Sequence, residues 1–401
     1  MKTGLFQLSA DPIHYGHLAL IGLATNECDR LVVLVTSSAT KDYTFTLAER
    51  TDMVRRAILQ QFPEETDTPQ IEVIASEAPL VDVYLREGCD VLIRGIRNKQ
   101  DKEFEFRQVM HHWRFCPALQ YQFIENVPAT LKTISSSSVK SMVAQGFDVS
   151  ELVPLFIKSK LERRILKQCL VGIAGRTGVG KSWVAKHLVE CEFWDLGLGH
   201  KGNRIKTAAH HINVDELVRE LLAEDSPGAQ QVRDRISTLL GPEVLTEDQK
   251  EIVREELHKA ILGASGDTLV KLHKTTAPHV HRLLRKHLRG KQGVILVEWA
   301  RLVEDCDLTN MVNNDVILVD APDVYRKKFL EARGFNFDLL ARFDANQPTA
   351  DQREQELLDL IHSDHCGFCL RYDNWEGQVQ ALRHIAEFIL AQYPGFKESL
   401  G

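Results

Sequence analysis

The segment 175–182 has the residue types and the spacing that could bind the phosphates of a nucleotide. It fits the pattern G-x-x-x-x-G-K-S, with every fixed position filled. An apolar run over 169–174 precedes it and predicts a buried strand, and residues 183–189 after it predict a helix. This strand–loop–helix context is the one that a phosphate-binding P-loop needs.

Each fixed residue of the pattern has a physical role in holding phosphate. Glycine lets backbone N–H groups converge on phosphate oxygens, and the helix that follows directs its positive end toward them. Lys181 is expected to reach the β- and γ-phosphates of ATP, and Ser182 is expected to bind Mg²⁺. The glycines of this predicted site are Gly175, Gly178 and Gly180.

A second candidate phosphate site lies near the start of the chain. His14 and His17 follow a strand expected over 5–8 and stand at the start of a helix expected over 18–24. Residues three apart share one face of a helix, and a helix N-terminus attracts anions, so the two imidazoles could bind phosphate. A pair of surface histidines without a ligand accounts for this short pattern equally well.

Two further polar segments follow in the first half. Arg94-Gly95-Ile96-Arg97 comes after a strand expected over 90–93, and open α/β sheets bind ligands beyond the carboxyl ends of their strands. Four serines at 135–138 open a predicted helix, where hydroxyl groups either cap the helix or bind phosphate. Capping accounts for one of these serines and leaves the others as candidate phosphate ligands.

Composition limits the class of protein. A chain of 401 residues predicts two or three domains, and a hydrophobic content of 44% is that of an ordinary globular protein. The formal net charge of −7 argues against broad nucleic-acid binding. Eight cysteines in a chain of this length predict no disulfide framework, and no apolar run approaches about 18 residues. We therefore expect a cytoplasmic protein without a membrane span.

Four motifs of the first half together resemble bacterial-type phosphopantetheine adenylyltransferase, a family of the His-x-Gly-His nucleotidyltransferase superfamily. The motifs lie in order at 9–17, 94–97, 134–137 and 146–154. The resemblance covers about residues 1–157. It implies a Rossmann-like domain that joins ATP to 4′-phosphopantetheine, giving dephospho-coenzyme A and pyrophosphate.

The resemblance also implies a role for each matching residue. His17 would stabilise charge on the α-phosphate, Arg94 would bind the triphosphate in the transition state, and Lys41 lies in the loop of the family's catalytic lysine. The other matches are the phosphate-binding Ser9, Ser135, Ser136 and Ser137 and the nucleotide-side Arg97 and Glu105. The family usually has glycine in place of Leu8 and an aromatic residue in place of Ala10.

The second half has the order of a P-loop kinase and resembles dephospho-coenzyme A kinase over about 168–393. Strands are expected over 212–214, 294–298 and 316–320. The resemblance makes Asp215 the base that takes the proton of the ribose 3′-hydroxyl. The further residues that it assigns are Arg219 and Glu298 on the acceptor side, Arg342 in a lid over the phosphates, and Asn374 in the nucleotide-base loop.

This half also departs from the kinase family. Asn213 replaces the first acid of the acceptor segment, and Ala277 stands where a histidine usually precedes Pro278. An insertion over 192–211 separates the P-loop helix from Asp215. These departures leave open an adenylyltransferase whose P-loop domain is noncatalytic and senses nucleotide.

The chain is thus predicted to be an α/β protein with two doubly wound parallel-sheet domains, a nucleotidyltransferase over 1–157 and a P-loop kinase over 168–401. We expect it to catalyse the last two steps of coenzyme A synthesis with ATP and Mg²⁺. Its expected ligands are 4′-phosphopantetheine, dephospho-coenzyme A and ATP, with neither nucleic acid nor membrane. A homo-oligomer formed through the N-terminal domain is left open.

A different pair of enzymes remains as an alternative. Nicotinamide mononucleotide adenylyltransferase fused to ribosylnicotinamide kinase also joins a His-x-Gly-His domain to a P-loop kinase.

A metal site near the C-terminus is a separate question left open, because histidine and Cys-x-x-Cys are common zinc ligands. The residues concerned are His362, His365, Cys366 and Cys369.

Overall fold

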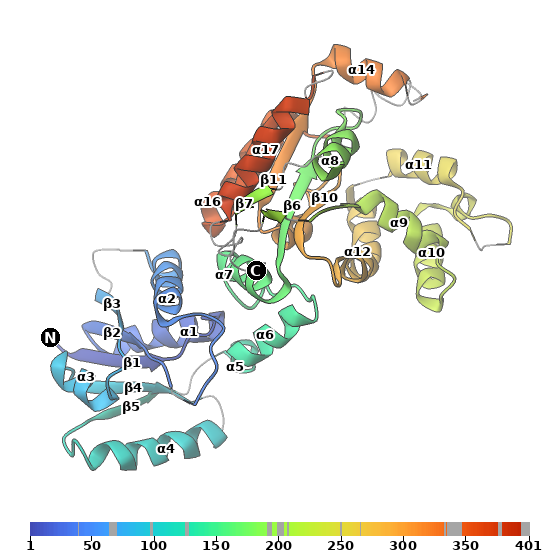
Figure 1. The fold of residues 1–401 in the computed structure, drawn as a ribbon. Helices are drawn as coiled ribbons and strands as arrows, with labels where there is room; N and C mark the ends of the chain where they lie inside the picture. The colour runs from blue at the N-terminus through green and yellow to red at the C-terminus, as the bar shows by residue number, and fades with distance from the viewer. Residues whose placement is uncertain are drawn as a thin grey trace. The chain divides into compact units, whose positions relative to one another are not determined.

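Two parallel sheets, each with five strands, organise the chain in a computed structural model (Figure 1). They belong to two units, Met1–Leu161 and Glu162–Gly401. The boundary falls at the end of α7 (Leu155–Leu161), within the connector, and a π-helical turn, Glu162–Leu166, comes next. The structure describes residues 1–38, 40–63, 70–96, 99–124, 128–190, 195–198, 204–206, 208–248, 251–264, 266–332, 334, 347–375 and 379–393.

The sheet of the first unit has the strand order β3-β2-β1-β4-β5, with every neighbouring pair parallel. The chain moves outward on one side from β1 to β3 and on the other side from β4 to β5. The order therefore reverses between β1 and β4, and ligands of open α/β sheets bind at the carboxyl ends of strands beside such a point. The strands are β1 (Thr3–Leu8), β2 (Arg30–Val35), β3 (Gln70–Ala75), β4 (Val91–Gly95) and β5 (Tyr121–Ile124).

Helices cover this sheet on both faces (Figure 1). On one face, Leu5, Val32 and Leu92 pack with the apolar side chains of α3. Helices α1 and α2 contact β1, β2 and β3. The helices are α1 (Tyr15–Ala24), α2 (Leu47–Gln61), α3 (Leu80–Arg86), α4 (Lys99–Trp113), α5 (Ala129–Lys132) and α6 (Ser136–Ala144), with a 3₁₀ turn at Thr25–Glu27.

The sheet of the second unit has the order β12-β11-β6-β10-β9, again with parallel neighbours throughout. The strand that leads into the predicted P-loop, β6, is central and lies between β10 and β11. The residues that end β10 and β11 therefore flank the P-loop. The strands are β6 (Gln168–Ala174), β9 (Ala209–Asn213), β10 (Gly293–Glu298), β11 (Asp315–Asp320) and β12 (Phe368–Asp373).

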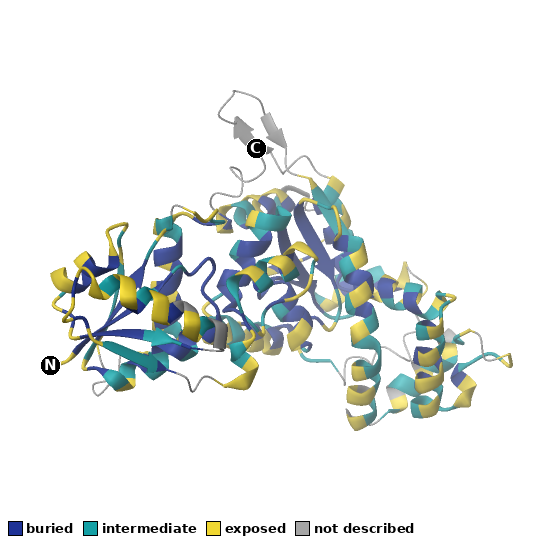
Figure 2. Cartoon of the chain, turned by 90° about the horizontal axis from the view of Figure 1, so that it is seen from below, coloured by how far each residue is buried: buried dark blue, intermediate teal, exposed yellow. Residues whose placement is uncertain are grey.

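Alternate residues of β6 enter two different cores, as the period of a strand requires. Val171 and Ile173 pack with α8 and α17, whereas Leu170 and Ala174 share a core with α9, α10, α12 and α16. Figure 2 shows these central strands buried beneath the helices. The helices are α8 (Lys181–Glu190), α9 (Val214–Ala223), α10 (Pro227–Leu240), α11 (Arg254–Gly263), α12 (Gly266–Leu288), α13 (Cys306–Met311), α14 (Asp323–Glu331), α16 (Ala350–Asp364) and α17 (Val379–Gln392).

Some elements differ from the sequence expectation. Arg94 and Gly95 belong to β4 instead of following it, because β5 extends the ladder beside them. The insertion over 192–211 contains a two-stranded antiparallel sheet, β7 (Asp195–Leu198) with β8 (Arg204–Lys206), and the start of β9.

None of the helices that the structure describes has both the length and the apolar composition needed to cross a bilayer.

Candidate active sites

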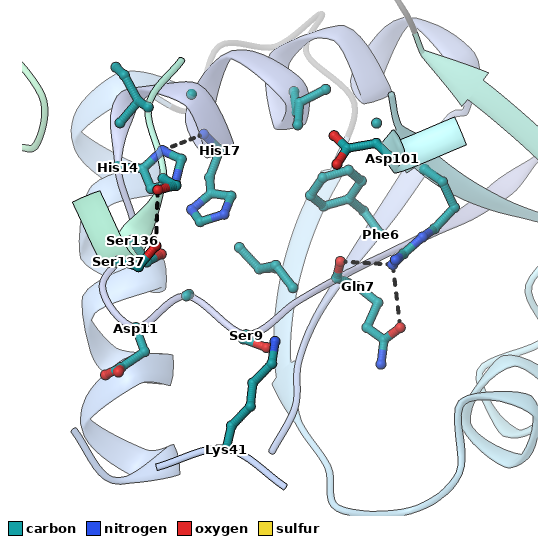
Figure 3. A pocket seen from close by; sticks show the side chains of 18 of the residues that line it. Phe6, Gln7, Ser9, Asp11, His14, His17, Lys41, Asp101, Ser136 and Ser137 are labelled. Carbon is teal, nitrogen blue, oxygen red and sulfur yellow. Dashed lines mark hydrogen bonds between the residues drawn. The ribbon is translucent and has the colours of Figure 1, made fainter. Parts of the chain in front are cut away.

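A cavity of about 600 Å³ opens at the carboxyl ends of β1 and β4, at the reversal of strand order. In Figure 3 the side chains of Ser9, His17 and Lys41 project into it from different segments. The predicted site residues that line this cavity are Ser9, His14, His17, Lys41, Arg94, Glu105, Ser135, Ser136 and Ser137. Arg97 lies outside the described residues. Tertiary structure thus gathers residues from three of the four motifs, those at 9–17, 94–97 and 134–137, around one space.

The two histidines have unequal positions in this cavity. His14 is only 2% exposed and caps α1, its Nδ1 accepting the backbone N–H of His17 at 3.3 Å. The two rings stack with centroids 3.6 Å apart (Figure 3). A side chain at Gly16 would approach the backbone oxygen of Leu131 to 3.0 Å, so glycine permits the close passage of α5. His14 therefore supports the ring of His17, which is the less buried of the two.

The serines at 135–138 have distinct local partners. Ser135 caps α6, and its side chain and that of Ser138 each accept the other's backbone N–H at 3.1 Å. Ser136 donates its hydroxyl to the carbonyl of Pro12 at 2.8 Å, which ties α6 to the loop after β1. Helix capping and this tie thus use three of the four serines, and the N-terminus of α6 is directed at the cavity.

Arg94 is held by a two-pronged ion pair with Glu105 of α4. Its Nε donates to one carboxylate oxygen at 2.7 Å and its Nη2 to the other at 2.6 Å. Its Nη1 donates to the backbone and side-chain oxygens of Gln7 at 3.2 and 3.3 Å. The structure thus places Glu105, expected on the nucleotide side, against Arg94, where it fixes the plane of the guanidinium group.

Arg50, which sequence reasoning missed, organises the loops around the cavity. It is fully buried, and its guanidinium donates to the carbonyls of Ser9, Thr36 and Phe45. It also lies over the ring of Tyr43, 4.0 Å from the centroid. One signal was present in the sequence, because a charge on the apolar stripe of a helix must find buried partners.

Asp11, also missed, joins three segments of the site. It is 5% exposed, and its carboxylate accepts the backbone N–H groups of Thr44 at 3.0 Å and Phe45 at 3.1 Å. The same carboxylate pairs with Lys140 of α6 at 2.7 Å. The preceding Ala10 has φ of +50°, a left-handed conformation that turns the chain sharply after β1. No pattern in the sequence predicts these long-range bonds of Asp11.

A second cavity, of about 920 Å³, adjoins the first. Both are lined by Ser9, Lys41 and Arg94, and both touch Gln7 and Glu105. Its other walls come from the loops after β2 and β3 and from the end of α4, with His112, Phe115 and Tyr121. The basic residues Lys41 and Arg94 therefore stand at the junction of two spaces, each large enough for a small molecule.

In the second unit the segment 175–182, predicted to be a P-loop, contains three glycines with positive φ. Gly175, Gly178 and Gly180 have φ of 147°, 86° and 89°, which side-chain-bearing residues rarely adopt. At Gly175 a Cβ would lie 2.1 Å from the carbonyl oxygen of Val319. Lys181 is 8% exposed, and its ammonium group donates to the carbonyls of residues 175 and 176 at 2.9 and 3.0 Å. The side chain of Lys181 therefore lies across the loop and bonds its backbone.

Glu298, at the end of β10, faces the P-loop serine. Its carboxylate accepts the hydroxyl of Ser182 at 2.7 Å, and it lies 2.9 Å from His211 Nε2 and 3.2 Å from the amide of Asn213. Glu298 is 4% exposed. Desolvation opposes its charge, yet the bonds from His211 and Ser182 prevail and lower its pKa. Glu298, expected on the acceptor side, lines the same pocket as Arg219 and also bonds Ser182, the predicted magnesium ligand.

Asp215 and Arg219 line a pocket of about 190 Å³ together with Lys181, Ser182 and Glu298. Asn213 caps α9 by accepting the N–H of Asp215 at 2.9 Å. Although Asp215 keeps an exposed surface, desolvation in the pocket raises the pKa of its carboxyl group, Lys181 opposes this and Glu298 adds to it. Acid, lysine and serine thus meet at the carboxyl edge of the sheet.

Asn374 lies behind the P-loop. It is 2% exposed, and its amide donates to the carbonyl of Val179 at 2.9 Å. A Cβ on Gly180 would come within 2.2 Å of that amide nitrogen. The asparagine expected in a nucleotide-base loop therefore braces the phosphate loop, because the end of β12 lies against it. Arg342, expected in a lid, lies outside the described residues.

The candidate metal ligands at 362–369 do not converge. The thiol of Cys366 lies 3.6 Å from the carbonyl oxygen of Asn313, and burial raises the pKa of Cys369 to about 11. The rings of His362 and His365 are 6.0 Å apart. Within the described part of the chain, these four residues form no group with metal-ligand spacing.

A family model and curated relatives match the first unit. A cytidylyltransferase-like family model matches residues 6–142. A phosphopantetheine adenylyltransferase of Rhizorhabdus wittichii is 30% identical over 167 residues, which is 42% of this chain and 96% of the relative. One of Clostridium botulinum strain Langeland is 31% identical over 172 residues, or 42% of this chain and 100% of the relative.

A crystal structure of a Thermus thermophilus protein, 22% identical, matches 57% of this chain and 99% of its own with a TM-score of 0.40.

The family model and the two adenylyltransferases agree with each other and with the cavity at β1 and β4. The relatives are matched over almost their whole length. Through its first unit, this chain therefore belongs to the phosphopantetheine adenylyltransferase family, and that unit is a nucleotidyltransferase.

Proposed function

We propose that the first unit transfers the adenylyl group of ATP to 4′-phosphopantetheine. The observation that carries this proposal is the junction of two cavities at Ser9, Lys41 and Arg94. A transfer between two anionic substrates needs two spaces that share cationic residues, because the attacking phosphate and the α-phosphate must approach each other. The names of the relatives supply the identity of the acceptor.

The proposed reaction exchanges one bond at phosphorus for another. A phosphate oxygen of 4′-phosphopantetheine attacks the α-phosphorus of ATP, the bond from that phosphorus to the oxygen bridging the β-phosphate breaks, and pyrophosphate leaves. His17, Lys41 and Arg94 would stabilise the negative charge that grows on these oxygens. Such a transfer needs no covalent intermediate, so positioning and charge stabilisation provide the acceleration.

The fixed orientation of these groups is part of the proposed mechanism. His14 supports the ring of His17, and Glu105 holds the guanidinium group of Arg94. Arg50 bonds the carbonyls that flank the loop bearing Lys41. Groups held in advance need not reorganise when charge develops, which is the main advantage of a preorganised site.

We further propose that the second unit is a P-loop kinase that phosphorylates the ribose 3′-hydroxyl of dephospho-coenzyme A. The carrying observation is that Asp215 shares a pocket with Lys181 and Ser182. The product of the first unit would then be the substrate of the second. We also propose that both steps take place in the cytoplasm, with ATP as the donor for each.

In the kinase step the acceptor hydroxyl attacks the γ-phosphorus of ATP, the bond from that phosphorus to the bridging oxygen of the β-phosphate breaks, and ADP leaves. The hydroxyl proton passes to Asp215, whose raised pKa suits a base better than that of an exposed aspartate. Lys181 would turn from the carbonyls that it now contacts to the phosphates, and Arg219 would bind the acceptor.

Magnesium fits the residues beside the P-loop. The hydroxyl of Ser182 and the carboxylate of Glu298 are 2.7 Å apart, and both are oxygen donors of the kind that Mg²⁺ prefers. When bound, Mg²⁺ neutralises charge on the phosphates. His211 and Asn213 would keep the carboxylate of Glu298 in place through their own bonds to it.

The test is to incubate the full chain with Mg-ATP and 4′-phosphopantetheine and to identify the products by mass. Wild type should form dephospho-coenzyme A and then coenzyme A. Lys181→Ala should stop at dephospho-coenzyme A. His17→Ala should still phosphorylate dephospho-coenzyme A that is supplied to it.

Three outcomes would contradict parts of the proposal. A preference for nicotinamide mononucleotide as acceptor would replace the first activity by that of the alternative enzyme pair. Binding of ATP without phosphorylation of dephospho-coenzyme A would make the second unit a nucleotide sensor. Coenzyme A formation by Lys181→Ala at the wild-type rate would remove the P-loop from the reaction.

A further inference from the structure

A histidine and two aspartates of the second unit lie close together outside the kinase pocket. His273 is on α12, and Asp305 and Asp307 lie at the start of α13. One potential ligand atom from each of the three lies within 4.8 Å of the others. His273 Nε2 and Asp305 Oδ2 are 3.3 Å apart.

Asp305 has an oxygen that its surroundings do not satisfy. The side chain of Asp305 is 5% exposed. Its Oδ1 accepts the backbone N–H of Leu308 at 3.1 Å and so caps α13. Its Oδ2 is buried and accepts no hydrogen bond from the residues that the structure describes. His273 Nε2 faces this oxygen at 3.3 Å without forming a hydrogen bond to it, so a cation that both groups bind would satisfy the buried oxygen.

We propose that His273, Asp305 and Asp307 bind a zinc ion. In tetrahedral zinc sites, bonds to imidazole nitrogen and carboxylate oxygen are both about 2.0–2.2 Å, so two such ligand atoms lie roughly 3.3–3.6 Å apart. The 3.3 Å between His273 Nε2 and Asp305 Oδ2 matches this spacing. Asp307 is exposed and free to turn toward the ion, and water would complete the coordination.

The ligand types favour zinc over the cations that phosphate chemistry uses. Magnesium and calcium take oxygen ligands, whereas imidazole nitrogen suits zinc and its neighbours among the transition metals. The site is also reachable, since the side chain of His273 is 40% exposed while that of Asp305 is 5% exposed. An ion would therefore enter from solvent past His273 and Asp307 and rest on the buried oxygen.

Zinc at this position would join two helices that support the kinase pocket. Leu283 and Leu284 of α12 share a hydrophobic core with Leu308 of α13 and Leu217 of α9. Helix α9 also carries Asp215 and Arg219, and α12 packs beside it (Figure 1). The ion would act structurally. It would fix α12 against α13 and so stabilise the position of α9, which packs on α12.

The experiment is a calorimetric titration of zinc into the full chain after treatment with a chelator, in excess magnesium to occupy oxygen sites. Wild type should bind one zinc ion more tightly than any other. His273→Gln and Asp305→Asn should each weaken that site by roughly 100-fold or more, since even outer-shell partners of zinc contribute 10–100-fold. Cobalt(II) in place of zinc should give a visible absorption band that both variants lack.

The variants keep the fold so that the result remains interpretable. Asp305→Asn retains an oxygen that can cap α13, because asparagine caps helices as well as aspartate does. His362→Gln, a surface substitution in the other histidine cluster, is the matched control and should bind zinc like wild type. Unchanged zinc affinity in both His273→Gln and Asp305→Asn would overturn the proposal. So would loss of the site in His362→Gln alone, or the absence of stoichiometric binding by wild type.

Discussion

The ion pair between Arg94 and Glu105 yields the sharpest test of the adenylyltransferase site. The two side chains are 19% and 9% exposed, and the carboxylate accepts two N–H groups at 2.7 and 2.6 Å. Glu105→Gln keeps the size of the side chain but replaces one accepting oxygen by an N–H₂ group. One charged hydrogen bond is lost, and the guanidinium group of Arg94 is free to rotate away from Gln7.

The expected loss follows from the burial of this pair. A hydrogen bond to a charged group contributes about 1.5–3 kcal/mol, and a largely buried one lies in the upper part of that range. If the lost energy is transition-state stabilisation, about 2–3 kcal/mol corresponds to a decrease of roughly 30- to 150-fold in kcat/KM, at 1.36 kcal/mol for each factor of ten. Glu103→Gln, an exposed position on the same helix, is the matched control and should retain wild-type kinetics.

The assay is pyrophosphate release from ATP and 4′-phosphopantetheine, measured for wild type, Glu105→Gln, Arg94→Gln and the double variant. If Glu105 acts through Arg94, its substitution should have little further effect once Arg94 is gone, so the two losses should not add. Fully additive losses would refute this reasoning. They would mean that Glu105 contacts the nucleotide itself, as the motif alone suggests.

Three further predictions concern the reacting groups. His17→Ala should raise the barrier to pyrophosphate release by about 3–4 kcal/mol, as the loss of an oxyanion donor does, and undiminished release would exclude that role. Asp215→Asn should keep ATP affinity and lose phosphorylation by roughly 10²–10⁴-fold, whereas Lys181→Ala should lose both; equilibrium binding and coupled ADP release distinguish them. Because desolvation raises the pKa of Asp215 and only its charged form accepts a proton, phosphorylation should decline with falling pH at a higher pH than an ordinary aspartate would set. An acid limb that persists unchanged in the residual activity of Asp215→Asn would assign it to another group.

Strands that are buried on both faces could be predicted from the sequence. β6, β10 and β11 read as continuous apolar runs because a parallel sheet covered by helices leaves no face to solvent. β5 and β12 were not anticipated, since each mixes polar with apolar residues and forms no continuous apolar run. The strand order also needed the structure, because it depends on contacts between segments far apart in the chain.

Residue types and local spacing by themselves predicted a P-loop and singled out the histidine pair and the four motifs of the first unit, since such chemistry depends on short segments. Only the tertiary structure decided which polar residues face the cavities and which hold other residues in place. Glu105 holds Arg94, Ser136 bonds Pro12, and Asn374 supports the P-loop. The physical reason is that a hydrogen bond depends on distance and direction in space, and partners as far apart in sequence as 195 residues meet only when the sheet has formed.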